Sequence, residues 1–250
     1  MTLKGKHALI TGGGSGIGLA IAHALAAKGA EVTITGRRRE VLANAAGGGL
    51  YAAAMDVTDE AAVVAGVSEA VAARGPIQIC IPNAGIAEGR ALHKTDAAFW
   101  RKIMATNLDG AFFTIRECLT SMRETDWGRV IAISSIAGLK GLRGASAYTA
   151  SKHGLIGLIR GLSEDYLGQP ITFNALCPGY VDTDIIAQNV ASISARTGAS
   201  HAVARDMMIE ANPHKRLIDP DEVAAAALWL CGPGSQSING QAIEIAGGQC

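Results

Sequence analysis

The feature that most constrains the fold is a regular alternation of short β-branched or apolar runs with longer stretches rich in alanine and leucine. The short runs predict seven strands, near residues 7–11, 31–35, 50–54, 77–81, 128–133, 171–176 and 241–245. The longer stretches predict helices near 16–28, 38–45, 59–73, 96–123, 147–167 and 220–230. Strands that alternate with helices form a parallel sheet covered on both faces. The sequence therefore predicts a doubly wound α/β fold with a seven-stranded parallel sheet.

Length and composition favour one domain. The chain has 250 residues, of which 49% are hydrophobic and 18% charged, so residues 1–250 can bury one large core. The segment at about 183–212 breaks the alternation and contains no predicted strand, and long insertions of this kind are usually functional. We expect a substrate lid or a mobile linker there. Gly47, Gly48 and Gly49 predict a tight turn from helix to strand.

Charge and cysteine content exclude several classes of protein. The 22 basic and 22 acidic side chains cancel, which gives no electrostatic reason to expect nucleic acid or an anionic membrane as partner. No apolar secretory segment and no stretch of membrane-spanning length is recognisable. The cysteines lack the spacing of a zinc site or a disulfide framework: Cys80, Cys118, Cys177, Cys231 and Cys250. We expect a soluble cytoplasmic protein without a metal site.

A glycine-rich turn follows the first predicted strand. The run Thr11-Gly12-Gly13-Gly14-Ser15-Gly16-Ile17-Gly18 leads into an alanine-rich helix. Glycines let a backbone approach a pyrophosphate, whose charge is met by the positive end of the helix. The generic Gly-x-Gly-x-x-Gly fingerprint is not met, because the relevant spacing is Gly12, Gly16 and Gly18. The turn alone is compatible either with a nucleotide site or with tight helix packing.

Three reactive side chains follow the fifth predicted strand: Ser135, Tyr148 and Lys152. Tyr148 and Lys152 are four residues apart, which places them on one face of a helix. A neighbouring cation favours phenolate, so we expect Lys152 to lower the pKa of Tyr148 from its usual value of about 10. Tyr148 is then a candidate general acid and base. Ser135 could donate a hydrogen bond to the same substrate oxygen.

Together with Asn83-Ala84-Gly85, Asn107 and Pro178-Gly179 followed by Thr183, these features resemble the short-chain dehydrogenase/reductase (SDR) family. The resemblance extends over nearly the whole chain and implies a Rossmann-like fold and hydride transfer with a nicotinamide cofactor. It implies Asn107, Ser135, Tyr148 and Lys152 as catalytic residues, with Asn107 holding a water in the proton relay. One departure is Pro82, where the family commonly has another asparagine.

The resemblance also implies a set of cofactor-binding residues. In it, Lys152 bonds the nicotinamide ribose and Asp56 meets the adenine. Read alone, Asp56 is most often a helix cap, Asn83-Ala84-Gly85 a turn, and Asn107 a residue that bonds its own backbone around a kink. The full set is Gly12, Ser15, Gly16, Ile17, Gly18, Arg37, Asp56, Val57, Asn83, Ala84, Gly85, Tyr148, Lys152, Pro178, Gly179, Val181 and Thr183.

The end of the second predicted strand indicates the cofactor. An acidic residue there would bond the adenosine ribose and repel a 2′-phosphate. This chain has Gly36 at that position, followed by Arg37, Arg38 and Arg39. A guanidinium offers bidentate donors to a phosphate. We therefore predict NADP, with NAD as the alternative if the arginines are only a solvated helix start.

Substrate identity depends on the loops around 86–95, 136–144 and 180–212. Hydroxybutyrate dehydrogenases of the resembled family hold a carboxylate with polar residues where this chain has Ala87, Ala137 and Ala145. An apolar pocket suits an aliphatic, cyclic or thioester ketone better. Lys140 and Arg143 could reach the acidic groups of a carrier or lie in solvent. His93 and His201 have no metal-ligand partner in the sequence and are interpreted as surface or lid residues.

The predicted function is hydride transfer between a nicotinamide and a ketone or secondary alcohol. The favoured substrate is a 3-oxoacyl thioester of acyl carrier protein or coenzyme A, as in the resembled oxoacyl reductases. An NAD-dependent dehydrogenase of cyclic or aromatic secondary alcohols is the alternative, and a catalytically silent NADP-binding regulator is a third possibility. Apolar residues on more than one face of segments 96–123 and 147–167, including Ile156, Leu158 and Ile159, predict a homotetramer.

Overall fold

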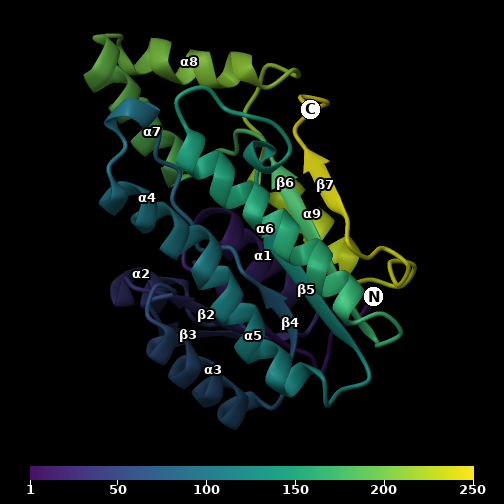
Figure 1. Cartoon of the computed structure of the whole chain (residues 1–250). Coiled ribbons are helices and arrows are strands. Elements are labelled where there is room, and N and C mark those ends of the chain that lie inside the picture. Colours follow the sequence, from purple (N-terminus) through teal and green to yellow (C-terminus); the bar gives the residue numbers. More distant parts are fainter.

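The predicted sheet is present, and its strand order creates a crevice. In the computed structural model all seven strands pair in parallel, in the order β3-β2-β1-β4-β5-β6-β7 (Figure 1). The chain builds outward from β1 to β3 and then crosses back to β4, so the order reverses between β1 and β4. Such a reversal leaves a crevice beyond the carboxyl ends of the strands. The strands are β1 (His7–Thr11), β2 (Glu31–Gly36), β3 (Leu50–Ala54), β4 (Ile77–Ile81), β5 (Gly128–Ile133), β6 (Ile171–Pro178) and β7 (Ala242–Ile245).

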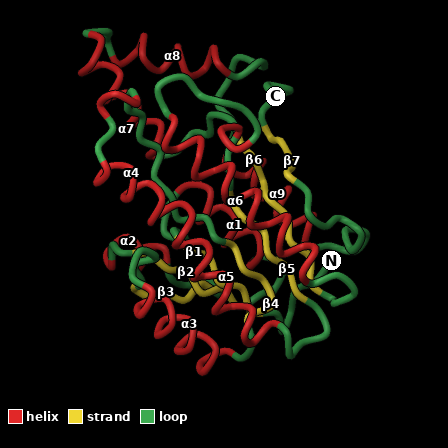
Figure 2. Tube along the Cα trace, in the orientation of Figure 1, coloured by secondary structure: helices red, strands yellow, loops and turns green.

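Helices cover both faces of this sheet (Figure 2). One apolar core lies under α1 and α9, and a second lies under α3, α5 and α6. The structure describes residues 1–250 apart from the side chains at positions 188, 192 and 196. The helices are α1 (Gly16–Ala26), α2 (Arg39–Ala45), α3 (Glu60–Arg74), α4 (Ala97–Met104), α5 (Gly110–Met122), α6 (Ser146–Asp165), α7 (Asp184–Thr197), α8 (His201–Ala211) and α9 (Pro220–Leu230).

The segment predicted as one helix over 96–123 is not a single continuous α-helix. It consists of α4 and α5 joined by a π turn over Ala105–Asp109. Gly110, at the start of α5, packs closely on Val57, since a Cβ there would lie 2.8 Å from the Cβ of Val57. The wider turn also directs the buried side chain of Asn107 inward.

The segment predicted as a lid folds into α7 and α8, which pack on each other. Their contact buries a small apolar cluster that is separate from the two main cores: Ile186, Val190, Ala204 and Met208. Where this segment begins and ends, Val181 and Ile218 form a parallel bridge. The two helices lie above the carboxyl ends of the strands (Figure 1).

Two further expectations can be compared with the fold. The turn at Gly47, Gly48 and Gly49 is confirmed, and all three glycines have positive φ, which explains why glycine is used there. Among the described residues, no helix combines the length and apolar character needed to cross a membrane.

Candidate active site

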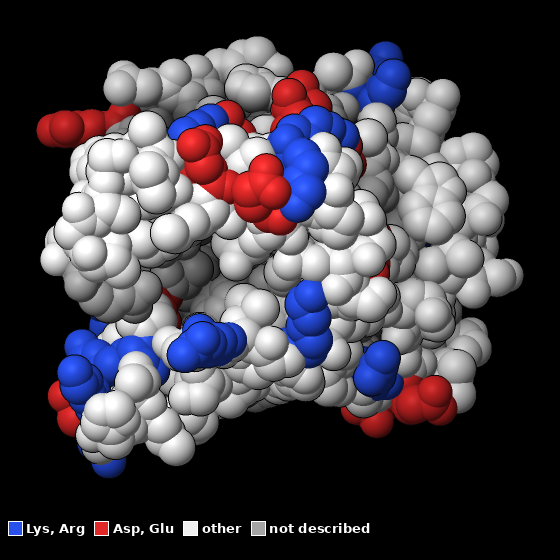
Figure 3. All heavy atoms as spheres, turned by 90° about the horizontal axis from the view of Figure 1, so that it is seen from above, with Lys and Arg blue, Asp and Glu red and all other residues white. Residues whose placement is uncertain are grey.

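Two adjoining cavities occupy the crevice at the carboxyl ends of the strands, and Figure 3 shows the hollow on this side of the molecule. The first, of about 440 Å³, is the turn cavity, because the glycine-rich turn and Arg37 line it. The second, of about 430 Å³, is the tyrosine cavity, because Ser135, Tyr148 and Lys152 line it. The two cavities share six wall residues and therefore form one continuous site: Ile17, Asn83, Gly85, Ile86, Thr183 and Ile185.

The glycine-rich turn is held from below by Asn83. The Nδ2 of Asn83 donates to the carbonyls of Thr11 and Gly12, at 2.9 and 3.2 Å. The Thr11 hydroxyl in turn accepts from the backbone N–H groups of Asn83 and Ala84, both at 3.0 Å. Pro82 does not disturb this turn, since its carbonyl accepts from the N–H of Ile133 as the sheet requires. The Asn-Ala-Gly turn therefore joins the two halves of the sheet.

Gly18 has a different place from the one expected. It does not line the turn cavity, whereas Gly12, Ser15, Gly16 and Ile17 do. A Cβ on Gly18 would lie 2.5 Å from the Nδ2 of Asn83 and 2.5 Å from the carbonyl of Gly12. Its role in the structure is to make room for the Asn83 contacts.

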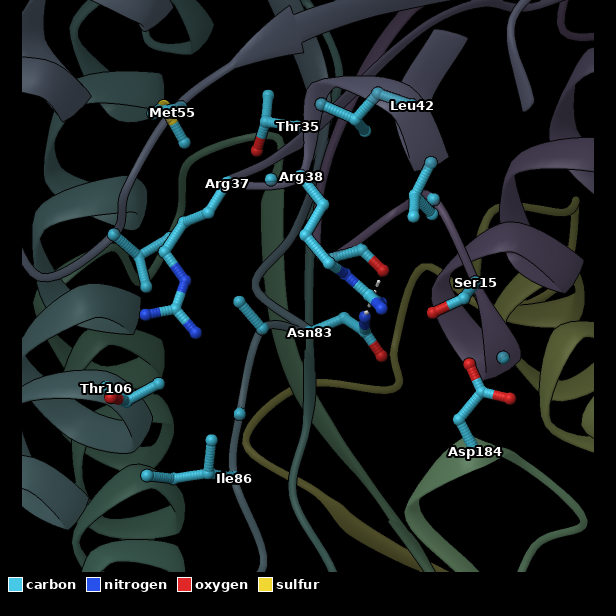
Figure 4. A pocket seen from close by; sticks show the side chains of 18 of the residues that line it. Ser15, Thr35, Arg37, Arg38, Leu42, Met55, Asn83, Ile86, Thr106 and Asp184 are labelled. Carbon is cyan, nitrogen blue, oxygen red and sulfur yellow. Dashed lines mark hydrogen bonds between the residues drawn. The ribbon is translucent and has the colours of Figure 1, made fainter. Parts of the chain in front are cut away.

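The far end of the turn cavity carries two guanidinium groups. Arg37 and Arg38 both line it and both extend into it, while Arg39 begins α2 and does not line it (Figure 4). The sequence predicts Arg37 alone as a cofactor ligand, and the structure adds Arg38. Neither arginine is in an ion pair with a described residue.

Asp56 and Val57 line the same end of the cavity. Asp56 is not the helix cap, because Asp59 caps α3. Its Oδ1 accepts from the backbone and hydroxyl of Thr58, at 3.0 and 2.8 Å. Burial opposes ionisation of Asp56, but the Thr58 bonds and the charge of Arg37 outweigh it and lower the pKa of the carboxyl.

This cavity fits a dinucleotide on three observations. Ser15 is the N-cap of α1, yet its hydroxyl makes no capping bond and points into the cavity (Figure 4). The hydroxyl of Thr35, in the cavity wall, is buried and has no partner among the described residues. The amino end of α1 opens on the same space, and such an end favours an anion. The Ser15 hydroxyl and the N–H groups of α1 at one end, and Thr35 with the two guanidiniums at the other, match the polar groups of a pyrophosphate and an adenosine.

Ser135 and Tyr148 meet in the tyrosine cavity. Ser135 follows β5, and its Oγ accepts from the N–H of Ala137 at 3.1 Å, which fixes the hydroxyl at the start of a short 3-10 turn. Ser135 and Tyr148 line the same part of this cavity, and the Ser135 hydroxyl is close enough to influence the pKa of Tyr148. Tyr148 lies in the first turn of α6, so its ring projects from the helix start toward the carboxyl end of β5.

Lys152 lies one turn further along α6 and is almost completely buried, with 4% of its surface exposed. Its Nζ donates to the carbonyl of Ile133 at 2.9 Å and lies 5.9 Å from the centre of the Tyr148 ring. Burial lowers the pKa of Lys152 to about 8. The predicted pairing of Tyr148 and Lys152 on one helix face is thus present.

The expected effect of Lys152 on Tyr148 is wrong for this state of the protein. Burial raises the pKa of Tyr148 above its ordinary value, and the nearby Ser135 hydroxyl offsets this only in part. The reason is that both groups are enclosed and the ammonium is directed to the Ile133 carbonyl. Tyr148 is therefore protonated at neutral pH, which is the state that a general acid needs.

Asn107 has a positioning role in addition to any bound water. Its Oδ1 accepts from the N–H of Ile86 at 2.8 Å, and its Nδ2 donates to the carbonyl of Ile86 at 3.0 Å and to the Ser151 hydroxyl at 3.1 Å. It does not bond its own backbone, contrary to the simpler interpretation. Asn107 fixes the wall residue Ile86 relative to α6.

The rest of the tyrosine cavity is mostly apolar. Ala87 and Ala145 line it as expected, whereas Ala137 is fully buried and does not. The end of β6 and the segment that follows it also line the cavity, through Pro178, Gly179, Val181 and Thr183. The sequence does not predict the residues that the folded lid contributes: Ile185, Ile186, Asn189, Ile193 and Met208. Tyr180 is a further addition, although its place directly after the Pro-Gly pair could have indicated it.

Of the charged residues considered as substrate contacts, Arg143 lines the tyrosine cavity and Lys140 does not. Arg143 is exposed. The Nζ of Lys140 donates to the carbonyl of Gln249 near the carboxyl terminus. His93 and His201 are exposed, as expected. Among the described residues, no group of His, Cys, Asp or Glu side chains could hold a metal ion.

The burial of Lys152 predicts a specific dependence of stability on pH. Its pKa is about 8 in the folded chain and 10.5 ordinarily, so between these values the unfolded chain binds more protons. Stability should therefore rise with pH through this interval. From about pH 8 to pH 10.5, the free energy of unfolding of the parent, relative to that of Lys152→Met, should increase by about 3 kcal/mol. Denaturant unfolding across the interval measures this, with the exposed Lys28→Met as control. If the difference in unfolding free energy between the parent and Lys152→Met did not change with pH, the lowered pKa of Lys152 would be contradicted.

Comparison with known proteins extends the agreement to the whole chain. Residues 6–194 match the family model for short chain dehydrogenase. The D-beta-hydroxybutyrate dehydrogenase of Cupriavidus necator is 34% identical, and the alignment covers 98% of each chain. The acetoacetyl-CoA reductase of Rhizobium meliloti is also 34% identical, with 98% of each chain covered.

A solved structure gives the same result. A variant of actinorhodin polyketide ketoreductase, crystallised with NADPH, superposes with a TM-score of 0.94 at 33% identity, covering 98% of this chain and 97% of that one. Since the family model matches most of the chain and these relatives are more than 30% identical over nearly its full length, this chain belongs to the short-chain dehydrogenase/reductase family and is an oxidoreductase that uses a nicotinamide cofactor.

Proposed function

We propose that this protein is an NADPH-dependent reductase of 3-oxoacyl thioesters, carried by acyl carrier protein or coenzyme A. The observation that carries the proposal is that Ser135, Tyr148 and Lys152 together line a mostly apolar cavity that adjoins the turn cavity. The alternative is an NAD-dependent dehydrogenase of cyclic or aromatic secondary alcohols. A silent NADP-binding regulator is less favoured, since a binding module needs no proton donor.

In the proposed reaction a ketone gains a hydride at carbon and a proton at oxygen, and becomes a secondary alcohol. A bound nicotinamide supplies the hydride. Tyr148 donates the proton to the carbonyl oxygen, and its raised pKa keeps it protonated beforehand. Ser135 holds the same oxygen by a hydrogen bond. Lys152, close to Tyr148, favours the phenolate that the transfer leaves behind, and Asn107 keeps Ile86 and α6 in place.

The walls of the tyrosine cavity support a thioester rather than a small carboxylate. Ala87 and Ala145 line it where the family's hydroxybutyrate dehydrogenases hold a carboxylate with polar side chains. Ile136, Leu142 and Met208 add apolar surface suited to an acyl chain. Arg143, exposed beside this wall, is placed to meet acidic groups of a carrier. One of the relatives described above is an acetoacetyl-CoA reductase, which agrees with this interpretation.

The preference for NADP rests on Arg37 and Arg38. Both extend into the turn cavity next to Gly36, which occupies the position at the end of β2 where an acidic residue would bond the adenosine ribose (Figure 4). Two guanidiniums there can bind a 2′-phosphate through charge-assisted hydrogen bonds. The structural neighbour that carries NADPH is consistent with this choice.

We also propose a homotetramer in the cytoplasm, although two of the residues expected to support it do not. Ile156 and Ile159 are buried within the chain, at 3% and 0% exposure, so they call for no partner. The support comes instead from a groove between α5 and α6, where Phe112 is 42% exposed and Leu158 and Leu162 line the floor. All five cysteines are free, which suits a reducing compartment.

The substrate proposal predicts a ranking of ketones. With NADPH, kcat/KM for acetoacetyl-CoA should exceed that for acetoacetate and for a cyclic ketone by more than about tenfold, because one lost charge-assisted contact has about that effect. Oxidation of reduced nicotinamide, followed by absorbance, measures it. Faster turnover of a cyclic alcohol with NAD would favour the alternative, and tight cofactor binding without turnover of any ketone would favour the regulator.

Removing Arg37 tests the cofactor. Arg37→Ala should weaken binding of NADPH by about tenfold to a hundredfold, and NADH much less, since a charge-assisted hydrogen bond is worth about 1.5 to 3 kcal/mol. The loss should shrink as salt is added, because the side chain is exposed. Fluorescence titration of both cofactors measures it. Arg39→Ala is the matched control, and Arg37→Ala with Arg38→Ala shows whether the two share the phosphate. An unchanged NADPH to NADH ratio in the double variant would support NAD.

The assembly proposal predicts a mass of four chains. Light scattering at micromolar concentration should give four times 25.7 kDa. Phe112→Asp should lower that mass, because it places a charge in the groove between α5 and α6. A monomer mass for the parent would contradict the proposal.

A further inference from the structure

Asn212, at the end of α8, is an asparagine for which the proposed chemistry has no use, yet it is fully buried. Its Oδ1 accepts from the N–H of Tyr180 at 3.1 Å, and its Nδ2 donates to the carbonyl of Tyr180 at 2.9 Å. The second hydrogen of Nδ2 goes to the carbonyl of Arg216 at 2.7 Å. Both polar atoms of the carboxamide are thus engaged, and two of its three bonds hold one residue.

The same arrangement occurs once more in the site. Asn107 is also buried, and its carboxamide likewise bonds both the N–H and the carbonyl of a single residue, Ile86. Ile86 and Tyr180 both line the tyrosine cavity, one from the segment after β4 and the other from the segment after β6. Two buried asparagines therefore fix two separate parts of the cavity wall.

Tyr180 is the residue through which Asn212 can affect the substrate. Its ring packs against the apolar cluster of the lid and also faces the tyrosine cavity. It lies close enough to Tyr148 to contribute to the raised pKa of that residue. Burial raises the pKa of Tyr180 itself, so its hydroxyl stays protonated and can donate a hydrogen bond. A small displacement of Tyr180 would move both the cavity wall and the lid.

Backbone hydrogen bonds around the Asn212–Tyr180 contact join the segment before α7 to the segment after α8. The carbonyl of Tyr180 also accepts from the N–H of Ile218 at 2.9 Å, and the N–H of Asp182 donates to the carbonyl of Ile218 at 2.9 Å. Gly179 leaves the space that Asn212 needs, since a Cβ there would lie 2.8 Å from the Oδ1 of Asn212. The entry to α7 and the exit from α8 are thereby held at Tyr180.

From these contacts we propose that Asn212 is a positioning residue for the ketone substrate: by holding the backbone of Tyr180 it fixes the tyrosine ring and the lid over the tyrosine cavity. The inference rests on the proposed reductase function. A purely structural role for Asn212 would lower stability and reduce the apparent kcat through the amount of folded protein, without changing the KM of the ketone. The positioning role instead raises the KM of the ketone more than the Kd of NADPH, because Tyr180 lines the tyrosine cavity and not the turn cavity.

The experiment compares the full-length parent with Asn212→Ala in NADPH-dependent reduction of acetoacetyl-CoA. The variant should lose between about tenfold and a hundredfold in kcat/KM, mostly through a higher KM, as expected when a positioning contact is lost. The Kd of NADPH should stay within about twofold, because Asn212 does not line the turn cavity. Asn212→Ser, which is smaller but polar, takes its place if the alanine variant does not fold.

Asn174→Ala is the matched control. Asn174 is equally buried and also uses its carboxamide twice, accepting from the N–H of Gln241 at 3.1 Å and donating to the carbonyl of Ile238 at 2.7 Å. It does not line either cavity. Asn174→Ala should therefore reduce thermal stability as Asn212→Ala does, while the KM of acetoacetyl-CoA stays at the parent value.

A double-mutant cycle with Tyr180→Ala separates the two roles. If Asn212 acts through Tyr180, Asn212→Ala should cost less than about threefold in kcat/KM once the ring has been removed. An equal loss in both backgrounds, or an unchanged KM in Asn212→Ala alone, overturns the inference while the reductase function stands. A parent that reduces no ketone overturns the proposed function and this inference together.

Discussion

The hydrogen bonds between Thr11 and Asn83 are the interaction on which the rest of the site depends. They join the ends of β1 and β4, the two strands between which the sheet order reverses. The reversal of strand order leaves the crevice in which the turn cavity and the tyrosine cavity lie. The close approach of Asn83 leaves no room for a Cβ at Gly18. This contact thus explains why residue 18 is a glycine.

Burial then sets the chemistry of the residues placed there. Enclosure raises the pKa of Tyr148 and lowers the pKa of Lys152, so each group is pushed toward its neutral form. A neutral phenol suits the proton donor of a reduction at neutral pH. Oxidation of an alcohol needs the phenolate and is favoured as the pH rises. Burial therefore keeps Tyr148 in the protonated form that the proposed reduction uses.

Much of this architecture could be predicted from the sequence, because the alternation of strands and helices is a local pattern. The start of β1, the bounds of α9 and the pairing of Tyr148 with Lys152 all follow from residue spacing. What could not be predicted depends on tertiary contacts. The π turn over Ala105–Asp109 interrupts a helix that the local pattern predicts as continuous, and the raised pKa of Tyr148 depends on its burial in the folded chain. Lys140 does not line the tyrosine cavity because its ammonium bonds the carbonyl of Gln249, which lies 109 residues away in the sequence.

The central claim is that Tyr148 transfers the proton, and the reaction of Tyr148→Phe tests it most directly. This variant keeps the ring in the cavity and removes only the hydroxyl. Turnover of the best ketone should fall by more than about a hundredfold, as general acid catalysis contributes at least that much, while the Kd of NADPH stays within a few-fold. A phenylalanine variant that kept turnover within about tenfold of the parent would contradict the account.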